Sequence, residues 1–250
     1  MCTAILSLEP GRPVLLAGVR DEFVDRAWLP PGRHWPDHPG LIGGRDLLAG
    51  GTWLVVAPES HRVTCVLNGP GPAAPPGSRQ TRGMLPLQVA DGGRLGSQAL
   101  ERFDPFHLLT AEPGAAVLWS WNGQRLTERE LKPGLHMVVN GGLAGDLRNA
   151  RDHERARIAH FLPRLRDAAR PDPLGGGQAP EAWGAWLPLV SGDGIASDDP
   201  RALIVRRDLG AGRVFGTTSV SLVALSPGGL RYDFADVPGD MGGWRSVSVN

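Results

Sequence analysis

The chain has 250 residues and a mass of 26.6 kDa, enough to bury a sizeable core in one large domain or two small ones. Its 26 basic and 26 acidic residues balance, which disfavours a dedicated nucleic-acid binder because there is no general attraction to phosphate. The 35 glycines and 23 prolines, with 41% hydrophobic residues, indicate a globular protein rich in strands and turns rather than a helical bundle.

Cys2 and Cys65 are the only cysteines, too few for a disulfide framework or a four-cysteine metal site. No stretch approaches the roughly 20 apolar residues that cross a bilayer, so stable membrane insertion is not expected. The first residues lack the charged and apolar regions of a signal peptide. We therefore expect a cytoplasmic protein in which residues 1–250 form a single domain.

The N-terminal residues predict a β-hairpin. Apolar runs at 3–8 and 14–19 flank a Pro-Gly turn, and neither run alternates, as expected for strands covered on both faces. The charged string Arg20-Asp21-Glu22 follows the second run, so we expect it at the mouth of that strand, close to Cys2. The segment 29–44, dense in Pro, Gly and His, is predicted to be a loop.

Two later segments are predicted to be helical. Residues 152–169 place apolar side chains at i, i+3, i+4 and i+7, and the arginines on the other face are interleaved with acidic residues, which indicates a solvated face rather than an RNA-binding one. Residues 95–110 predict a helix interrupted by Pro105. The remaining apolar runs are interpreted as strands, at 52–57, 63–67, 115–121, 135–139, 220–225 and 230–234. This order favours an α+β fold with two sheets face to face and helices outside.

Cys2 is the most informative candidate for chemistry. A cysteine directly after the initiator Met becomes the N-terminus when Met1 is removed, and then carries both a thiol and a free α-amine. An α-amine has a reference pKa of roughly 7.7–8.0, so it can act as the base for a thiol on the same residue. The alternative interpretation is an inert cysteine that opens a buried strand.

Charged and amide side chains supply the other candidates. Asp21 could orient the ammonium group, and Arg20 could favour the thiolate or hold a substrate carboxylate; the alternative is a surface salt-bridge cluster. Asn68 and Asn140 each follow a predicted strand and precede Gly, where an amide can stabilise the negative charge that develops on a carbonyl oxygen. Asn-Gly is also a common turn dipeptide, so either one could be structural.

Several segments together resemble the NRDE family, also called the TANGO2 or transport-and-Golgi-organisation protein 2 family. They are Met1-Cys2-Thr3, Gly18-Val19-Arg20-Asp21-Glu22-Phe23, Gly43-Gly44-Arg45-Asp46, Ala49-Gly50-Gly51-Thr52-Trp53-Leu54, Thr64-Cys65-Val66-Leu67-Asn68, Arg82-Gly83 and residues 134–143. This family looks related to the N-terminal-nucleophile (Ntn) hydrolases. The resemblance therefore implies a four-layer αββα sandwich with two mainly antiparallel sheets.

The same resemblance implies roles for particular residues. Cys2 would be the nucleophile, Asp21 the carboxylate beside it, and Asn68 and Asn140 the amides on the oxyanion side. Substrate contacts would come from Arg20, Arg82 and Thr218. Two positions depart from the family pattern: Val19 stands where the first Asn of Asn-Arg-Asp-Glu is expected, and Thr218 stands where an arginine is expected.

Two functions follow from these expectations. The first is an Ntn-type cysteine hydrolase or acyltransferase that acts on a linear amide or acyl bond of a small molecule and needs no metal or organic cofactor. The second is a non-catalytic carrier that uses the same cleft for a hydrophobic ligand, because the resemblance also suggests handling of haem or of acyl-CoA and lipid. His34 and His38 are four residues apart, but Pro36 between them argues against a metal site on one helical face.

Overall fold

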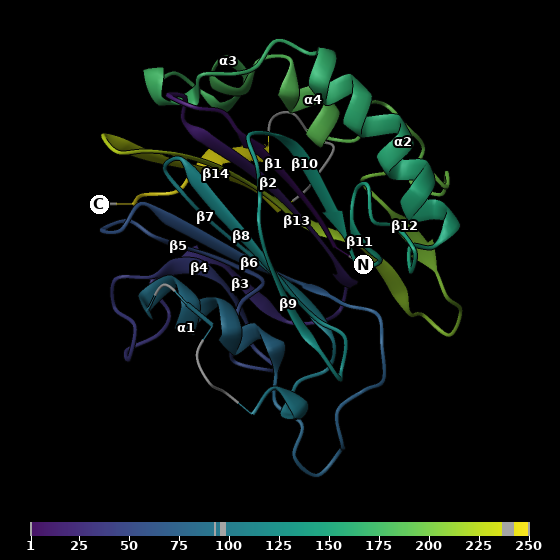
Figure 1. Ribbon diagram of the computed structural model, residues 1–250. Coiled ribbons are helices and arrows are strands. Elements are labelled where there is room, and N and C mark those ends of the chain that lie inside the picture. Colours follow the sequence, from purple (N-terminus) through teal and green to yellow (C-terminus); the bar gives the residue numbers. More distant parts are fainter. Residues whose placement is uncertain (1, 93, 96–98, 237–242, 250) are drawn as a thin grey trace.

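The computed structural model describes residues 2–92, 94–95, 99–236 and 243–249. Two antiparallel sheets pack face to face, and helices lie on the outer face of each sheet (Figure 1). This arrangement confirms the expected α+β fold with four layers in the order αββα. Within the described residues, no helix combines the length and apolar character needed to cross a membrane.

The sheet drawn uppermost in Figure 1, sheet A, has eight strands in the order β11-β10-β1-β2-β13-β14-β15, with β12 paired to β13. Its strands are β1 (Thr3–Leu8), β2 (Val14–Phe23), β10 (Gly134–Val139), β11 (Gly142–Leu143), β12 (Arg206–Asp208), β13 (Val214–Ser226), β14 (Gly229–Ala235) and β15 (Trp244–Ser246). The predicted hairpin is confirmed, since β1 pairs with β2. On its other side β1 pairs with β10, so the N-terminal strand lies inside the sheet.

The second sheet, sheet B, has seven strands in sequential order from β3 to β9. They are β3 (Trp28–Gly32), β4 (Ile42–Asp46), β5 (Leu54–Ala57), β6 (Arg62–Asn68), β7 (Phe106–Glu112), β8 (Ala115–Trp121) and β9 (Leu126–Glu130). Asn122-Gly123, a dipeptide typical of hairpin turns, lies in the connection between the paired strands β8 and β9. Sheet B is therefore a simple meander, and it places the ends of β6 and β7 next to each other.

The helices form the two outer layers. Sheet A is covered by α2 (Asp152–Asp167), α3 (Ala179–Trp183) and α4 (Trp186–Val190), and sheet B by α1 (Leu85–Gly92) (Figure 1). The predicted helix at 152–169 is confirmed as α2, and Ile158, Phe161 and Leu165 point into the layer shared with sheet A. Three short 3-10 helices complete the elements, at Arg82–Met84 (η1), Leu100–Arg102 (η2) and Pro173–Gly175 (η3).

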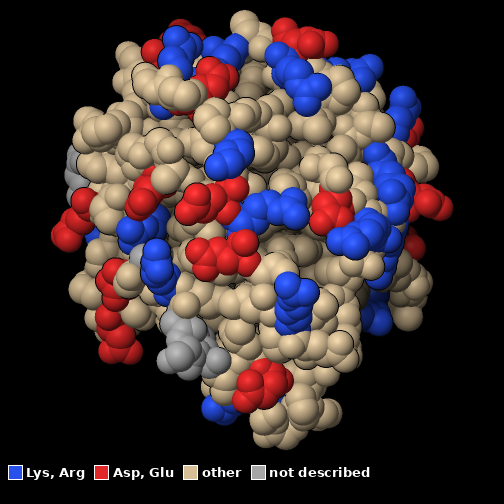
Figure 2. All heavy atoms as spheres, in the orientation of Figure 1, with Lys and Arg blue, Asp and Glu red and all other residues tan. Residues whose placement is uncertain are grey.

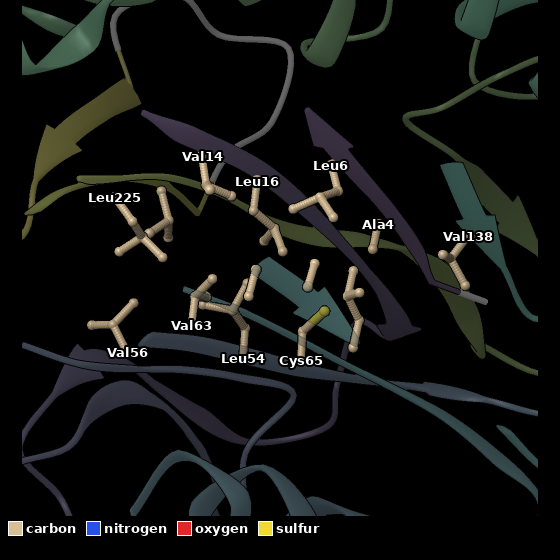
Figure 3. Close-up of a cluster of buried hydrophobic side chains, with 14 of the residues drawn as sticks. Ala4, Leu6, Val14, Leu16, Leu54, Val56, Val63, Cys65, Val138 and Leu225 are labelled. Atoms are coloured by element: carbon tan, nitrogen blue, oxygen red, sulfur yellow. The ribbon is translucent and has the colours of Figure 1, made fainter. Parts of the chain in front are cut away.

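The main core lies between the sheets. Figure 3 shows Ala4, Leu6 and Leu16 of sheet A pointing toward Leu54 and Cys65 of sheet B, and all of these side chains are buried. Because neighbouring residues of a strand point to opposite faces, the odd-numbered residues of β1 and β2 meet the helices instead. Both faces of these strands are apolar for this reason, which explains why the sequence does not alternate.

Two expectations about secondary structure are wrong, at 29–44 and at 95–110. The segment 29–44 contains most of β3 and the start of β4; its prolines are tolerated because β3 is the edge strand of sheet B. The expected helix at 95–110 is not formed: residues 96–98 lie outside the described residues, and Phe106–Glu112 is β7, an interior strand of sheet B. The apolar residues of this short segment, interrupted by His107 and Thr110, fit a buried strand as well as a helix, and here the strand is formed.

The charged string at 20–22 does not follow its strand, as the sequence suggested, but lies within it. Strand β2 continues to Phe23 and pairs with β13 along its whole length. Arg20 and Asp21 are only 4% and 3% exposed, so they form part of the interior rather than a surface salt-bridge cluster. Buried charges of this kind need specific partners, and those partners define the candidate site.

Candidate active site

Cys2 lies directly before β1, where β1 pairs with β10. In this antiparallel pair Thr3 is opposite Val139. Cys2 precedes Thr3 and Asn140 follows Val139, so the pairing brings Cys2 and Asn140 together. The backbone nitrogen of Cys2 donates a hydrogen bond to Oδ1 of Asn140 at 3.3 Å. The Cys2 side chain is half-buried and packs against the core between the sheets.

His107 supports Asn140 from the other sheet, and the sequence analysis did not identify it. It belongs to β7 and is 6% exposed. Its Nε2 lies 3.2 Å from the carbonyl oxygen of Asn140, and its Nδ1 lies 2.7 Å from Oγ of Ser120. A carbonyl can only accept, so Nε2 carries the hydrogen and Nδ1 accepts from Ser120. Burial lowers the pKa of His107, which favours this neutral form.

Arg20 points from β2 into the space between the sheets. Its NH1 donates to Oγ1 of Thr218 at 2.8 Å, and its guanidinium carbon lies 4.3 Å from the ring centroid of Trp53. Asp46 supplies a carboxylate 3.8 Å from NH2. Burial lowers the pKa of Arg20, but these contacts stabilise the charge. The guanidinium is thus fixed in place beside the Cys2 pocket.

Asp21 points to the opposite face of β2, toward α2. Its Oδ1 accepts a hydrogen bond from Oγ1 of Thr217 at 2.7 Å, and its Oδ2 lies 3.8 Å from NH1 of Arg157. Arg157 is fully buried and also donates to Oγ1 of Thr3, the residue after Cys2, at 2.9 Å. Burial raises the pKa of Asp21, although the positive charge of Arg157 and the Thr217 hydrogen bond oppose that effect.

A β-bulge allows two adjacent threonines to reach these two charges. In the pairing of β13 with β2, Thr217 is opposite Asp21 and Ser219 is opposite Arg20, so Thr218 is the extra residue. Thr217 bonds Asp21, and Thr218 both accepts from the Arg20 side chain and donates to its backbone oxygen at 3.3 Å. Thr218, which stands where the family resemblance led us to expect an arginine, is therefore a hydrogen-bond partner of Arg20.

A pocket of about 140 Å³ opens at Cys2. Five of the seven residues proposed from the sequence lie on its wall: Cys2, Arg20, Asp21, Asn68 and Arg82. A second pocket of about 490 Å³ shares Asn68 and Arg82 with it and also has Asn140 on its wall. Thr218 is 8% exposed and lies behind Arg20 rather than on the wall of either pocket.

Two glycines hold the wall of the smaller pocket together. The backbone nitrogen of Thr52 donates to the carbonyl oxygen of Gly83 at 2.9 Å. A Cβ on Gly51 would lie 2.4 Å from the carbonyl carbon of Gly83, so only glycine fits this close approach. The segment around Gly51, which precedes β5, therefore packs closely against η1, which carries Arg82. NH1 of Arg82 donates to the Pro105 carbonyl at 2.9 Å, and burial lowers the pKa of Arg82.

The described part of the chain contains no group of three or more His, Cys, Asp or Glu side chains that could hold a metal ion. The arrangement offers instead the thiol of Cys2, the backbone nitrogen of Cys2 held by Asn140, and nearby amide and guanidinium groups that can donate hydrogen bonds. These are the groups needed for nucleophilic attack on a carbonyl carbon and for stabilisation of the resulting oxyanion.

Comparison with solved structures defines the fold class. The chain is similar to the "mutant C2A conjugated bile acid hydrolase from Clostridium perfringens", with a TM-score of 0.50 and 10% sequence identity over 99% of this chain and 92% of that chain. At this identity the likeness concerns the fold, which is that of the Ntn hydrolases. The expectation of an Ntn-hydrolase-like αββα sandwich is confirmed.

The sequence matches the family described as "Transport and Golgi organisation 2" (TANGO2) over residues 1–165. The chain belongs to this family, as its motifs indicated. The matched region contains both strands of the N-terminal hairpin, all of sheet B and most of α2, and so most of the candidate site. A comparison with curated proteins gives no match.

Proposed function

We propose that the protein is an N-terminal cysteine hydrolase or acyltransferase that acts on a linear amide or related acyl bond of a small molecule. One observation carries this proposal. The nitrogen of Cys2 is held by Oδ1 of Asn140 at the edge of a pocket that Arg20, Asn68 and Arg82 also line. In an Ntn enzyme the same nitrogen becomes the catalytic base once the preceding residue is removed.

The proposed reaction starts with removal of Met1, which converts the Cys2 nitrogen into an α-amine. This amine takes the proton of the Cys2 thiol, and the sulfur forms a bond to the carbonyl carbon of the substrate. The electron pair of the carbonyl bond moves to oxygen, giving a tetrahedral oxyanion. When the oxyanion collapses, the bond to the leaving amine breaks, and that amine takes the proton from the α-ammonium group. A thioester on Cys2 remains.

Water or an acceptor amine then resolves the thioester. The α-amine takes a proton from the incoming nucleophile, the acyl carbon bonds to it, and the sulfur leaves and regains a proton. Asn140 Oδ1 is engaged by the Cys2 nitrogen, which leaves the Nδ2 hydrogens of Asn140 to donate to the oxyanion, together with Asn68. Each such donor contributes about 10²–10³ in rate in comparable sites.

The comparisons support this assignment in one further respect. The similar structure is described as a hydrolase, and its description names a C2A mutant, which replaces a cysteine at position 2. The present chain also has a cysteine at position 2, immediately before a strand at the centre of its sheet. We infer that Cys2 acts as the nucleophile in this chain too.

The test uses the full chain purified from cells. Intact mass measures removal of Met1, and a panel of N-acyl amides and acyl thioesters is screened for turnover and for an acyl adduct on Cys2. We expect an adduct mapped to Cys2, and turnover that is lost in Cys2→Ala and retained in the matched control Cys65→Ala. Retention of Met1, or turnover that survives in Cys2→Ala, would contradict the proposal.

The second candidate, a carrier for haem or an acyl-CoA or lipid ligand, is supported by the size of the pocket beside Cys2, about 490 Å³. It predicts binding without chemistry. Titration with haemin should then give a shifted Soret band at micromolar protein, and acyl ligands should bind without forming a Cys2 adduct. Adduct formation with turnover would decide for the hydrolase instead.

A further inference from the structure

The larger pocket lies directly beside the nucleophile. Its volume is about 490 Å³, and it shares Asn68 and Arg82 with the pocket at Cys2. Asn140, which holds the Cys2 nitrogen, also lines it. A substrate whose carbonyl carbon lies at Cys2 would therefore extend one end past Arg82 into this space. The chemistry of the wall indicates what that end is.

Three arginines from separate parts of the chain line this pocket. Arg82 comes from η1, Arg151 precedes α2, and Arg207 belongs to β12. Arg82 is partly buried at the junction of the two pockets, whereas Arg151 and Arg207 are exposed. His153 lies on the same wall, and burial, together with the positive charges of Arg157, Arg207 and Arg151, lowers its pKa. Positive charge is thus concentrated around one cavity.

Three arginines outnumber the two acidic residues of the wall, Glu154 and Asp104, and Asp104 is already paired with Arg79, so the wall keeps a positive balance. Glu154 is 2% exposed, and its Oε2 accepts a hydrogen bond from the Arg151 backbone nitrogen at 2.8 Å. Asp104 accepts from the Ala74 backbone nitrogen at 3.0 Å and lies 3.2 Å from Arg79. Arg151 and Arg207 both line this cavity and are exposed to solvent.

This concentration is local rather than general. Figure 2 shows acidic and basic side chains interspersed over the face that it presents, as expected for a chain with equal numbers of both. Successive side chains of β12 point to opposite faces of the sheet. Of its three residues only Arg207 lines the pocket, as does Phe215, which is opposite Arg207 on β13. Arg206 is exposed on the same strand but is not part of the wall.

We propose that this pocket binds an anionic group, a carboxylate or a phosphate, at the end of the acyl substrate, held by Arg82, Arg151 and Arg207. The proposal rests on the proposed function for the position of the carbonyl, but the binding itself does not require turnover. Guanidinium groups bind carboxylate and phosphate oxygens in bidentate geometry, and partial burial of Arg82 strengthens its attraction for an anion. The volume leaves room for a short linker between the anion and the carbonyl.

The test uses three N-octanoyl probes that share the acyl amide and carry different terminal groups. N-octanoylglycine carries a carboxylate, N-octanoyl-O-phosphoethanolamine carries a phosphate, and N-octanoylglycinamide is neutral. Affinities are measured by calorimetry on the full chain with Cys2→Ala, so that no probe is turned over. We expect one or both anionic probes to bind about tenfold more tightly than the neutral probe. Their ranking distinguishes the carboxylate from the phosphate.

Matched variants assign the effect to the pocket. In the Cys2→Ala background, Arg207→Gln and Arg151→Gln should each reduce the preference for the anion about threefold or more, whereas Arg206→Gln, which removes the same charge from the same strand as Arg207, should leave it unchanged. The proposal is overturned by equal affinity for charged and neutral probes, by no binding of the anionic probes at millimolar concentration, or by equal effects of Arg206→Gln and Arg207→Gln.

Turnover by the chain with Cys2 intact separates this inference from the proposed function. If the anionic probes bind more tightly but no adduct forms on Cys2, the proposed anion site is supported and the proposed hydrolase function is contradicted. If an adduct forms on Cys2 but charged and neutral probes bind with equal affinity, the proposed hydrolase function is supported and the proposed anion site is contradicted.

Discussion

Oδ1 of Asn140 accepts a hydrogen bond from the backbone nitrogen of Cys2, although the two residues are 138 positions apart in sequence. The pairing of β1 with β10 brings them together. The amide of Asn140 can therefore serve two partners at once. Its oxygen holds the nitrogen that would become the catalytic base, and in the proposed reaction its Nδ2 hydrogens donate to the substrate oxygen.

Asn140→Asp separates these two roles. The carboxylate keeps an acceptor for the Cys2 nitrogen but has no hydrogen to donate to an oxyanion. We expect kcat/KM on the best substrate of the acyl panel to fall by about 10²–10³, with an unchanged thermal unfolding midpoint. Activity within about twofold of wild type would show that Asn140 does not stabilise the oxyanion.

The two cysteines should react very differently with an alkylating agent. Burial raises the pKa of Cys65 to about 12, whereas Cys2 is half-buried beside an open pocket. Because the thiolate is the reactive form, iodoacetamide should label Cys2 of the native protein at least about tenfold faster than Cys65. Peptide mass spectrometry over a time course measures both rates. Unfolding in guanidinium provides the control, since it should make the two rates similar.

His107 should make stability depend on pH. Its pKa is lowered by burial in the folded protein, so on acidification the unfolded chain binds the proton first, near the reference pKa of about 6.5. Stability should therefore fall as the pH drops below about 6.5, by at most about 1.4 kcal/mol per pH unit from this group. His107→Gln keeps a donor for the Asn140 carbonyl but does not titrate.

Urea unfolding of wild type and His107→Gln between pH 7.5 and 5 measures this contribution. The stability of wild type relative to the variant should decrease toward pH 5. A constant difference across the range would mean that His107 has the same proton affinity in the folded and unfolded states.

Arg157 is expected to be essential for stability. It is buried, donates to the Ala202 carbonyl at 2.8 Å and to Thr3, and lies 3.8 Å from Asp21. Arg157→Met removes the positive charge and leaves a buried carboxylate, which should cost about 3–5 kcal/mol of unfolding free energy. Adding Asp21→Asn removes that carboxylate and should recover part of the loss. Strict additivity in this double-mutant cycle would argue against an interaction between the two side chains.

The close approach of Gly51 to Gly83 gives a test of the pocket wall. A Cβ at position 51 would overlap the backbone at Gly83, so Gly51→Ala should separate β5 from η1 and destabilise the fold by about 1–3 kcal/mol. Gly77→Ala is the matched control, because no heavy atom lies within 4 Å of its Cβ position. Equal thermal midpoints for the two variants would contradict the role assigned to Gly51.

The elements that the sequence predicted correctly are those with local signals. The N-terminal hairpin has two apolar runs around a turn, and α2 has a clear helical period. Strand β7 was mistaken for part of a helix because the apolar residues between Phe106 and Ala111, interrupted by His107 and Thr110, have no period that separates the two structures. Strand β3 was missed because prolines at an edge strand look like those of a loop.

The candidate site shows the same division. Cys2, Asp21 and the two asparagines could be proposed from their places beside predicted strands. His107 and Arg157 could not, because their roles depend on Asn140, 33 positions from His107, and Thr3, 154 positions from Arg157. A buried histidine or arginine has no sequence signal of its own until the sheets and α2 are packed. Supporting residues of this kind are therefore visible only in the folded structure.

The bulge at Thr218 also restricts which sequences this backbone can accept. Its side chain lies against the Arg20 guanidinium, in a space that is only 8% exposed. An arginine in place of Thr218, the residue that the resemblance led us to expect here, would place two like charges together in a confined interior. Thr218→Arg would thus be unfavourable in this background unless Arg20 or its surroundings also changed.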